Sequence, residues 1–326
     1  MEWNHSAPCK QIGSDSRESQ KESPILLSVV ATVSGRMSDF LRTITGSFCS
    51  PAADNPTIAL MEAAFSHHRL PWVYLNCEVP DGAISQAVAG ALAMGWRGFN
   101  CSMPHKQTVI PELHTLALSA RIIGAVNCVV NDDGELTGHN TDGRGFIDSL
   151  DGVIDVRGAR IVILGAGGAA RAIAVEAALG GAAHLTLVNR NPTRAQDVAD
   201  AVSVACEGVG TTFRAMETEY AIPAQTDLLV QATSIGLSPN VDEMPSIQVT
   251  SLHPNLVVAD VIPNPAMTRL LRVAAERGCR TVTGTQMLIN QAIANLELWS
   301  GIRADAAVML DAFAAALVPA EQDSRR

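Results

Sequence analysis

The chain has 326 residues, 47% of them hydrophobic, which is enough for two ordinary domains that each bury a core. Its formal net charge is −10 and it has no cluster of Lys or Arg, which argues against nucleic acid or an anionic membrane surface as a partner. The alanine-rich stretch after Gly168 is broken by charged residues well before the roughly 18 apolar residues of a membrane span, so we expect no membrane association.

The seven cysteines are scattered singly, without the close pairs that zinc sites and disulfide frameworks use. This pattern predicts reduced thiols, a cytoplasmic protein and no bound metal. Residues 1–37 are rich in Ser, Gln and charge, and their short apolar run, 25–33, follows a longer polar lead than a signal peptide has. We expect residues 1–37 to be a disordered extension, with Met37 as an alternative start.

The next block, residues 38–143, alternates strand-like and helical runs, which predicts a βαβαβ arrangement. The strand-like runs are Leu41–Thr45, Trp72–Leu75 and Gly98–Asn100, and the helical runs are Ile58–His67 and Ile84–Met94. The block ends in a polar hairpin over residues 125–140, with the Asn-Asp-Asp-Gly segment 131–134 as its turn.

The block from 144 to 286 opens with Arg160–Leu164, an apolar run that leads into a glycine-rich turn and an alanine-rich helix. Further strand candidates follow at Leu185–Val188, Leu228–Gln231, Leu256–Asp260 and Thr281–Thr283. Strands that alternate with helices in this way predict a Rossmann-type, doubly wound parallel sheet. The pattern is helical beyond Gly284, and we expect the helices of residues 287–318 to pack back on the first block.

The glycine-rich turn predicts a dinucleotide site, because backbone without Cβ atoms can approach a pyrophosphate at a helix N-terminus. The residues expected to contact it are Gly165, Ala166, Gly167, Gly168 and Ala169. An acid at the end of the next strand would favour NAD, but this chain has Asn189 and Arg190 there and Arg194 one helical turn later. Two guanidinium groups suit a 2′-phosphate, so NADP is the predicted cofactor. The alternative is that both arginines are only solvated and contact no phosphate.

Three further segments carry the candidate chemistry: Gly98–Lys106, Ile123–Asn127 and Gly138–Gly145. Together they resemble the shikimate/quinate dehydrogenase family, whose corresponding elements are G-x-N-V-T-x-P-x-K, G-A-x-N-T and G-x-N-T-D-G-x-G. Residues 231–237 and 287–292 resemble its N-A-T-x-x-G-[ML] loop and M-L-x-x-Q-A helix. The resemblance covers about residues 43 to 301, and it implies an N-terminal α/β substrate domain followed by the NADP-binding domain.

By this resemblance, Lys106 and Asp142 are the catalytic pair, and Ser102, Asn127 and Gln291 contact the substrate. Asn189, Arg190 and Arg194 fall on the family's phosphate clamp, and Thr233 and Gly284 are further cofactor contacts. Oxidation of a secondary alcohol requires the hydroxyl proton to leave as hydride is lost, and a positioned Lys–Asp pair can accept or relay that proton.

The family's carboxylate clamp, G-x-P-x-x-H-S-x-S-P-x-x-H-N, is not kept in this chain. A register counted back from Phe65 places Asn55 and Thr57 on the two serine positions, whereas a register shifted by two residues places Ala53 and Asn55 there. We prefer the first, since an amide and a hydroxyl can still donate to a carboxylate; the alternative for Asn55 is that it only initiates a turn. Pro263 also stands where the family usually has a tyrosine, and Gln286 where it has a glycine.

The predicted function is therefore NADP-dependent oxidation of shikimate, or of a related cyclic hydroxy acid such as quinate or aminoshikimate, to its 3-dehydro form, and the reverse reduction. The alternatives are an NADP-dependent oxidoreductase that acts on another small hydroxy acid, and a regulatory NADP-binding homologue without turnover. The sequence leaves both a monomer and a homodimer open.

Overall fold

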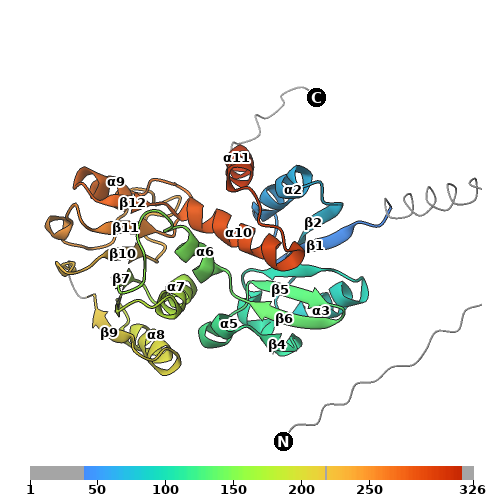
Figure 1. The fold of residues 1–326 in the computed structure, drawn as a ribbon, viewed down its shortest axis with the longest axis horizontal. Helices are drawn as coiled ribbons and strands as arrows, with labels where there is room; N and C mark the ends of the chain where they lie inside the picture. Colours follow the sequence, from blue (N-terminus) through green and yellow to red (C-terminus); the bar gives the residue numbers. More distant parts are fainter. Residues whose placement is uncertain (1–39, 217–218, 318–326) are drawn as a thin grey trace, which may run out of the picture. The chain divides into compact units, whose positions relative to one another are not determined.

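A computed structural model describes residues 40–216 and 219–317, and these form two six-stranded sheets with helices packed on them (Figure 1). The predicted α/β class, with a Rossmann-type parallel sheet in the second half of the chain, is confirmed. The predicted disordered extension over residues 1–37, and with it the alternative start at Met37, lies outside the described residues.

The first sheet, here called the substrate sheet, has the strand order β2-β1-β3-β5-β6-β4. Its strands are β1 (Thr43–Cys49), β2 (Trp72–Glu78), β3 (Gly98–Cys101), β4 (Thr115–Leu116), β5 (Cys128–Asp132) and β6 (Glu135–His139). β1 lies parallel between β2 and β3, and this pairing on both sides carries it to Cys49, four residues beyond the predicted end. The predicted hairpin is present as antiparallel β5 and β6, with positive φ at Asp133 and Gly134 in the turn.

Each helix that accompanies the substrate sheet follows one of its strands along the chain. They are α2 (Thr57–His67), α3 (Ile84–Ala93), α4 (His105–Thr108), α5 (Leu118–Ile123) and α6 (Asp142–Asp148), with a 3₁₀ turn, η1, at Ile110–Glu112. In α2 the buried residues Leu60, Met61, Ala64 and Phe65 recur at helical spacing and share a core with Tyr74 of β2.

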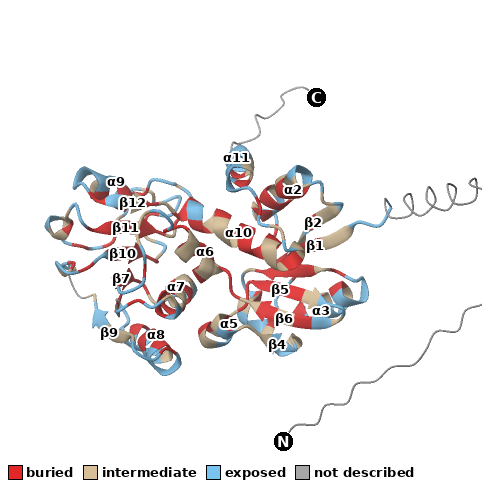
Figure 2. Cartoon of the chain, in the orientation of Figure 1, coloured by how far each residue is buried: buried red, intermediate tan, exposed pale blue. Residues whose placement is uncertain are grey.

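The second sheet, here called the dinucleotide sheet, is parallel throughout and has the order β12-β11-β10-β7-β8-β9. Its strands are β7 (Arg160–Leu164), β8 (His184–Asn189), β9 (Gly210–Ala215), β10 (Leu228–Gln231), β11 (Val257–Asp260) and β12 (Arg280–Val282). Every residue of β10 and β11 is buried, as expected for central strands covered on both faces (Figure 2). The strand order reverses between β7 and β10, and this is where doubly wound sheets open a crevice at their carboxyl ends.

The helices on this sheet are α7 (Gly168–Leu179), α8 (Pro192–Ala205) and α9 (Arg269–Glu276), and a short 3₁₀ turn, η2, covers Val249–Ser251. β9 was not predicted from the sequence. It lies at the edge of the sheet with its last three residues exposed, so it lacks the apolar run that marks the other strands.

Two C-terminal helices, α10 (Gly284–Ser300) and α11 (Ala306–Leu317), follow the last strand. α10 packs on α6 and α2, and α11 packs on α2 (Figure 1). The Trp299 indole N–H near the end of α10 donates to the Val129 carbonyl of β5 over 3.0 Å. At the start of α10, Gly284 lies so close to Ile262 that a Cβ would be 2.4 Å from its carbonyl oxygen. One helix therefore contacts both sheets.

Candidate active site

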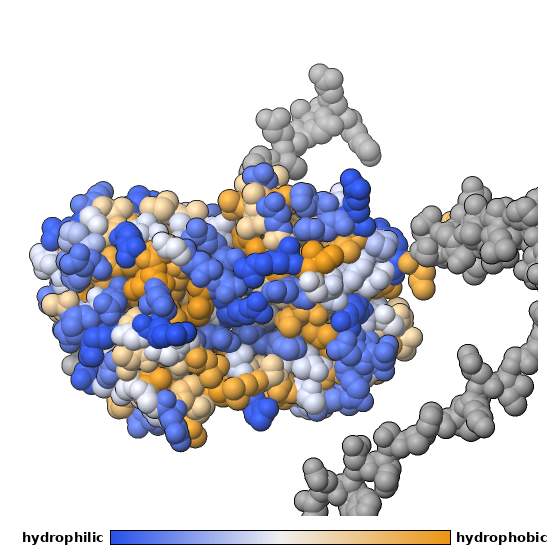
Figure 3. All heavy atoms as spheres, viewed as in Figure 1, coloured by the Kyte–Doolittle hydropathy of each residue, from blue (hydrophilic) through white to orange (hydrophobic). Residues whose placement is uncertain are grey.

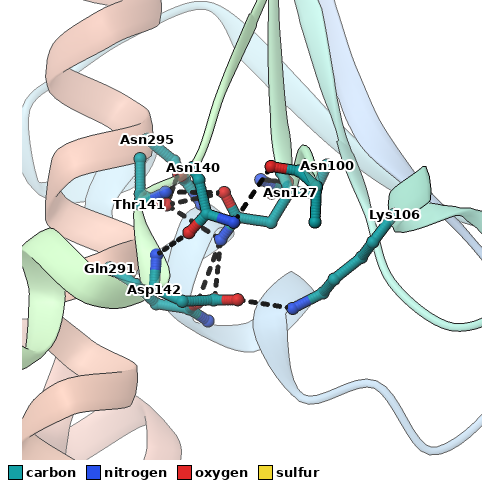
Figure 4. A network of polar contacts seen from close by, with 9 residues as sticks. Asn100, Lys106, Asn127, Asn140, Thr141, Asp142, Gln291 and Asn295 are labelled. Atoms are coloured by element: carbon teal, nitrogen blue, oxygen red, sulfur yellow. Dashed lines mark hydrogen bonds and ion pairs between the residues drawn. The ribbon is translucent and has the colours of Figure 1, made fainter. Parts of the chain in front are cut away.

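The centre of the site is an ion pair between Lys106 and Asp142. Lys106 lies in α4, directly after β3, and Asp142 is the first residue of α6, directly after β6. The Lys106 Nζ is 2.6 Å from the Asp142 Oδ2, and the side chains are 34% and 13% exposed (Figure 4). An ammonium group has three N–H donors and only one is used here, so two remain for a substrate oxygen.

The Asp142 carboxylate is fixed by amide side chains behind it. The Asn127 Nδ2 donates to the Asp142 Oδ1 over 2.7 Å, while the Asn127 Oδ1 accepts from the Thr141 backbone N–H over 2.8 Å. The Asn140 Oδ1 accepts from the Asp142 backbone N–H over 3.2 Å. Because Asn127 is 4% exposed and its oxygen is held by a backbone donor, its amide cannot turn over. The carboxylate therefore faces Lys106 in a defined orientation.

The other predicted substrate contacts, Gln291 and Ser102, differ in how they are connected to this pair. Gln291 of α10 accepts a long hydrogen bond of 3.4 Å from the Asn127 Nδ2. Ser102 follows β3, where its backbone N–H donates to the Phe48 carbonyl and its hydroxyl makes no hydrogen bond to a described residue. Asn295 lies one helical turn beyond Gln291, and its Oδ1 accepts from the Thr141 hydroxyl over 2.7 Å. The sequence analysis missed this residue, although a polar residue on the buried face of α10 is a usable signal.

The clamp positions lie on the segment between β1 and α2. The Asn55 Oδ1 accepts from the Thr57 backbone N–H over 3.1 Å, and the Asn55 Nδ2 lies 3.1 Å from the Ser47 Oγ and 3.8 Å from the Cys49 Sγ. Thr57, which begins α2, is 8% exposed, and its hydroxyl makes no hydrogen bond within the described part of the chain. Neither side chain is hydrogen bonded to Lys106 or Asp142.

A cavity of about 510 Å³ opens at the carboxyl ends of the central strands of the dinucleotide sheet. Nine of the ten predicted cofactor contacts line it: Gly165, Ala166, Gly167, Gly168, Ala169, Asn189, Arg190, Arg194 and Thr233. The tenth, Gly284, does not line the cavity but packs behind the lining residue Ile262. The face drawn in Figure 3 carries apolar patches over the part of the chain that holds this sheet, and polar residues across its middle.

The geometry of the cavity fits a dinucleotide. Gly165 has φ +115°, and a Cβ there would lie 2.6 Å from the Ala232 carbonyl oxygen, so the backbone of the turn lies against β10. α7 begins directly after Gly167, which places backbone N–H groups at the turn. The lining residues include Arg190 and Arg194 and no acid. Ala232 of the 231–237 loop also lines the cavity, and sequence reasoning missed Val261 and Ile262 of the apolar wall beside it, for which the carboxyl end of β11 was the available signal.

Asp260, at the end of β11, holds the wall of this cavity in place. Its Oδ1 accepts from the Ile262 backbone N–H over 3.0 Å and its Oδ2 accepts from the Thr268 hydroxyl over 2.7 Å. Burial raises the pKa of the Asp260 carboxyl to about 6, although these hydrogen bonds to Ile262 and Thr268 oppose the rise. The loop that carries Val261, Ile262 and Pro263 therefore depends on one buried carboxyl group.

Fold and site together define a class: a two-sheet α/β protein in which a dinucleotide cavity accompanies a Lys–Asp pair, as in oxidoreductases. Family models match along the chain: "Shikimate dehydrogenase substrate binding domain" over residues 48–129, "Shikimate / quinate 5-dehydrogenase" over 150–244, and "Shikimate 5'-dehydrogenase C-terminal domain" over 284–312. Shikimate dehydrogenase (NADP(+)) of Alkaliphilus oremlandii is 39% identical over 262 residues, which are 79% of this chain and 92% of that protein. The chain belongs to the shikimate/quinate dehydrogenase family, and the resemblance inferred from its sequence is confirmed.

Two solved structures that are similar to this chain carry different activities in their names. Shikimate 5-dehydrogenase of Listeria monocytogenes, in complex with shikimate and NAD, is 32% identical with a TM-score of 0.78, and the match covers 83% of this chain and 96% of that one. The 5-ketofructose reductase of a Gluconobacter strain is 49% identical with a TM-score of 0.82, and the match covers 85% of this chain and 99% of that one.

Proposed function

We propose that this protein is an NADP-dependent oxidoreductase that oxidises shikimate to its 3-dehydro form and catalyses the reverse reduction. The observation that carries the proposal is the Lys106–Asp142 pair at 2.6 Å, in a family whose curated relatives are named shikimate dehydrogenase (NADP(+)). The complete set of Lys106, Asp142, Asn127 and Gln291 argues against a regulatory homologue without turnover, since cofactor binding alone does not require a proton-relay lysine.

The proposed mechanism uses the residues of the substrate sheet to hold the alcohol and to move its proton. The glycine turn, Arg190 and Arg194 would hold NADP, which would supply the hydride acceptor when bound. The two unused N–H groups of Lys106 donate to the substrate oxygen and stabilise the negative charge that develops on it. The Lys106 ammonium passes one proton to the Asp142 Oδ2 across the 2.6 Å contact, and the amine lone pair that this leaves accepts the hydroxyl proton as hydride departs, so the pair takes up one proton for each hydride removed.

The proposed division of labour follows the two sheets. Residues 38–143, together with the C-terminal helices of 287–318, bind the substrate, and residues 144–286 bind NADP. The match of the substrate-binding family model to residues 48–129 supports this assignment. A cytoplasmic location is part of the proposal and is supported by the free thiols of the six cysteines in the described ranges.

A second candidate reaction is the reduction of a ketose such as 5-ketofructose. It is favoured by the 49% identity to 5-ketofructose reductase over 99% of that chain. The altered clamp positions, Asn55 and Thr57, point the same way, because a ketose has no carboxylate to hold. This candidate keeps the same cofactor, the same Lys106–Asp142 pair and the same direction of hydride transfer as shikimate formation.

The test is a steady-state assay of the purified protein. NADP⁺ and NAD⁺ are offered separately with shikimate and with quinate, and NADPH is offered with 5-ketofructose. NADP-linked turnover of shikimate supports the proposal, and turnover of 5-ketofructose alone supports the second candidate. If all substrates are inert while NADPH fluorescence still reports binding, the proposed chemistry is wrong.

A further inference from the structure

The orientation of the Asn55 amide is fixed by its neighbours. The Thr57 backbone N–H, 3.1 Å away, can only be met by the amide oxygen, because the opposite orientation would set two donors against each other. The NH₂ group must therefore face β1, where its two hydrogens meet the Ser47 Oγ and the Cys49 Sγ. Both N–H donors of the Asn55 side chain are thus used inside the protein, and its oxygen accepts from a backbone N–H.

The partners of Asn55 are themselves closed into a ring with Asn76 of β2. The Ser47 hydroxyl donates to the Asn76 Oδ1 over 3.0 Å, and the Asn76 Nδ2 donates back to the Asn55 backbone carbonyl over 2.9 Å. Ser47 is fully buried, so turning Asn55 toward a substrate would remove a donor from a buried oxygen. We call Ser47, Asn55 and Asn76 the amide lock.

The remaining groups near the clamp offer little to a carboxylate. The Ser50 hydroxyl already donates to Glu78, the last residue of β2, over 2.5 Å, and that carboxylate also accepts from the Ala52 N–H, so a negative charge lies against this loop. Pro263, which stands at the position of the family's tyrosine and lines the dinucleotide cavity, has no hydroxyl to offer. The Thr57 hydroxyl is the one donor at the two clamp positions that has no hydrogen bond to a described residue. One neutral hydroxyl does not replace the solvation that a bound carboxylate loses.

By contrast, the groups suited to alcohol and ketone oxygens are intact. Lys106 has two unused N–H donors, the Ser102 hydroxyl has no partner among the described residues, and Asn127 and Gln291 lie beside the ion pair. These groups bind hydroxyl and carbonyl oxygens whether or not the molecule carries a charge.

We infer that the pocket recognises its substrate through hydroxyl and carbonyl oxygens and not through a carboxylate, and that the amide lock at Asn55 is the specificity-determining feature. The inference rests on the NADP-linked chemistry of the proposed function at Lys106 and Asp142, and it names the substrate class: a neutral polyhydroxylated alcohol or ketone is turned over at least as well as a hydroxy acid of the same shape.

The experiment compares shikimate with its methyl ester, which has the same ring and no charge, in the full-length protein with NADP⁺. We expect kcat/KM for the ester to equal or exceed kcat/KM for shikimate. A working carboxylate clamp would instead make kcat/KM for shikimate about tenfold higher or more, because each lost hydrogen bond to a charged group costs roughly that factor. A preference of tenfold or more for shikimate overturns the inference and leaves the proposed function standing.

The Asn55→Ser variant tests the lock itself. A serine can still accept from the Thr57 N–H in a local turn, and it presents a hydroxyl where the family has one. We expect kcat/KM for shikimate to rise about tenfold and that for the ester to change by less than about threefold. A fall for shikimate alone overturns the inference. If Asn55→Ser does not fold, the comparison of acid and ester in the unaltered protein decides.

A third probe, 5-ketofructose with NADPH, separates this inference from the proposed function. Turnover of the ketose without turnover of shikimate or its ester supports a neutral substrate. If all three compounds are inert while NADPH binds, both the proposed function and the inference are overturned.

Discussion

The carboxyl ends of the two sheets are built in different ways. At the dinucleotide sheet, the cavity floor is backbone: a turn with Gly165 pressed against β10 and the first residues of α7. At the substrate sheet, the site consists of side chains that come from distant segments, such as Asn127 and Gln291, 164 residues apart. A backbone site tolerates side-chain change as long as its glycines remain, whereas a side-chain site can be altered by one residue.

This difference explains why the two halves of the active site have diverged unequally. The cofactor half keeps its glycine turn and its two arginines. The substrate half keeps Lys106 and Asp142 but uses the Asn55 amide within its own framework. Chemistry and recognition are carried by separate residues there, so recognition can change while the chemistry stays.

The largest expected effect is a loss of turnover, caused by a change at the substrate sheet, that leaves cofactor binding at the dinucleotide sheet intact. Lys106→Ala removes the donor to the substrate oxygen and the proton relay, so kcat should fall by roughly 10²–10⁴. NADPH binding, measured by fluorescence, should be unchanged, because the cofactor contacts lie on the other sheet. Arg121→Ala, an exposed cation of α5, is the control and should keep kcat within about twofold. An unchanged kcat in Lys106→Ala removes Lys106 from the mechanism.

The next effect concerns the buried carboxyl of the dinucleotide sheet. The rise of the Asp260 pKa from 3.8 to about 6 corresponds to about 3 kcal/mol. The folded protein keeps this proton up to about pH 6 while the unfolded chain releases it near 3.8, so Asp260 lowers the free energy of unfolding as pH rises from about 4 to about 6. Urea unfolding at several pH values should show Asp260→Asn gaining stability relative to the unaltered protein over that window. Parallel pH profiles would contradict the assignment.

The arginines at the end of β8 should decide the choice of dinucleotide. Loss of either Arg190 or Arg194 removes hydrogen bonds to a charged phosphate, each worth about 1.5–3 kcal/mol, so KM for NADP⁺ should rise about 10- to 150-fold. KM for NAD⁺, which lacks that phosphate, should stay within about twofold. Arg277→Ala, at the end of α9, is a control on the same sheet. Equal effects on both dinucleotides would mean that these arginines do not contact the 2′-phosphate.

The smallest expected effect lies where α6 meets α10. A Cβ at Gly145 would be 2.5 Å from the Gln291 backbone nitrogen, so Gly145→Ala should lower the free energy of unfolding by about 1–3 kcal/mol and displace Gln291. Gly90→Ala, in α3 with nothing within 4 Å, should be neutral or stabilise by up to about 1 kcal/mol. Urea unfolding compares the two variants. Equal stabilities would show that α6 and α10 are not closely packed.

What the sequence revealed corresponds to features that are local in the chain. The glycine turn, the 131–134 hairpin turn and the Gly98–Lys106 loop are each contained in one segment, and the fold class, the family and NADP are confirmed. The edge strand β9 was not readable because it is half exposed. The use of the Asn55 amide was also out of reach, because it is decided by Ser47 on β1 and Asn76 on β2, which only the folded sheet brings together.

Lys106 is the only lysine between residues 40 and 317; the other long cationic side chains in that range are arginines. A reagent that acylates primary amines therefore meets a single ε-amino group in the described part of the chain, and it is the one paired with Asp142. The number of acyl groups bound per chain in that range therefore equals the fraction of enzyme that is inactivated. A bound substrate analogue should slow the acylation of Lys106. Lysine acetylation would act on this protein as an inactivating switch at its catalytic centre.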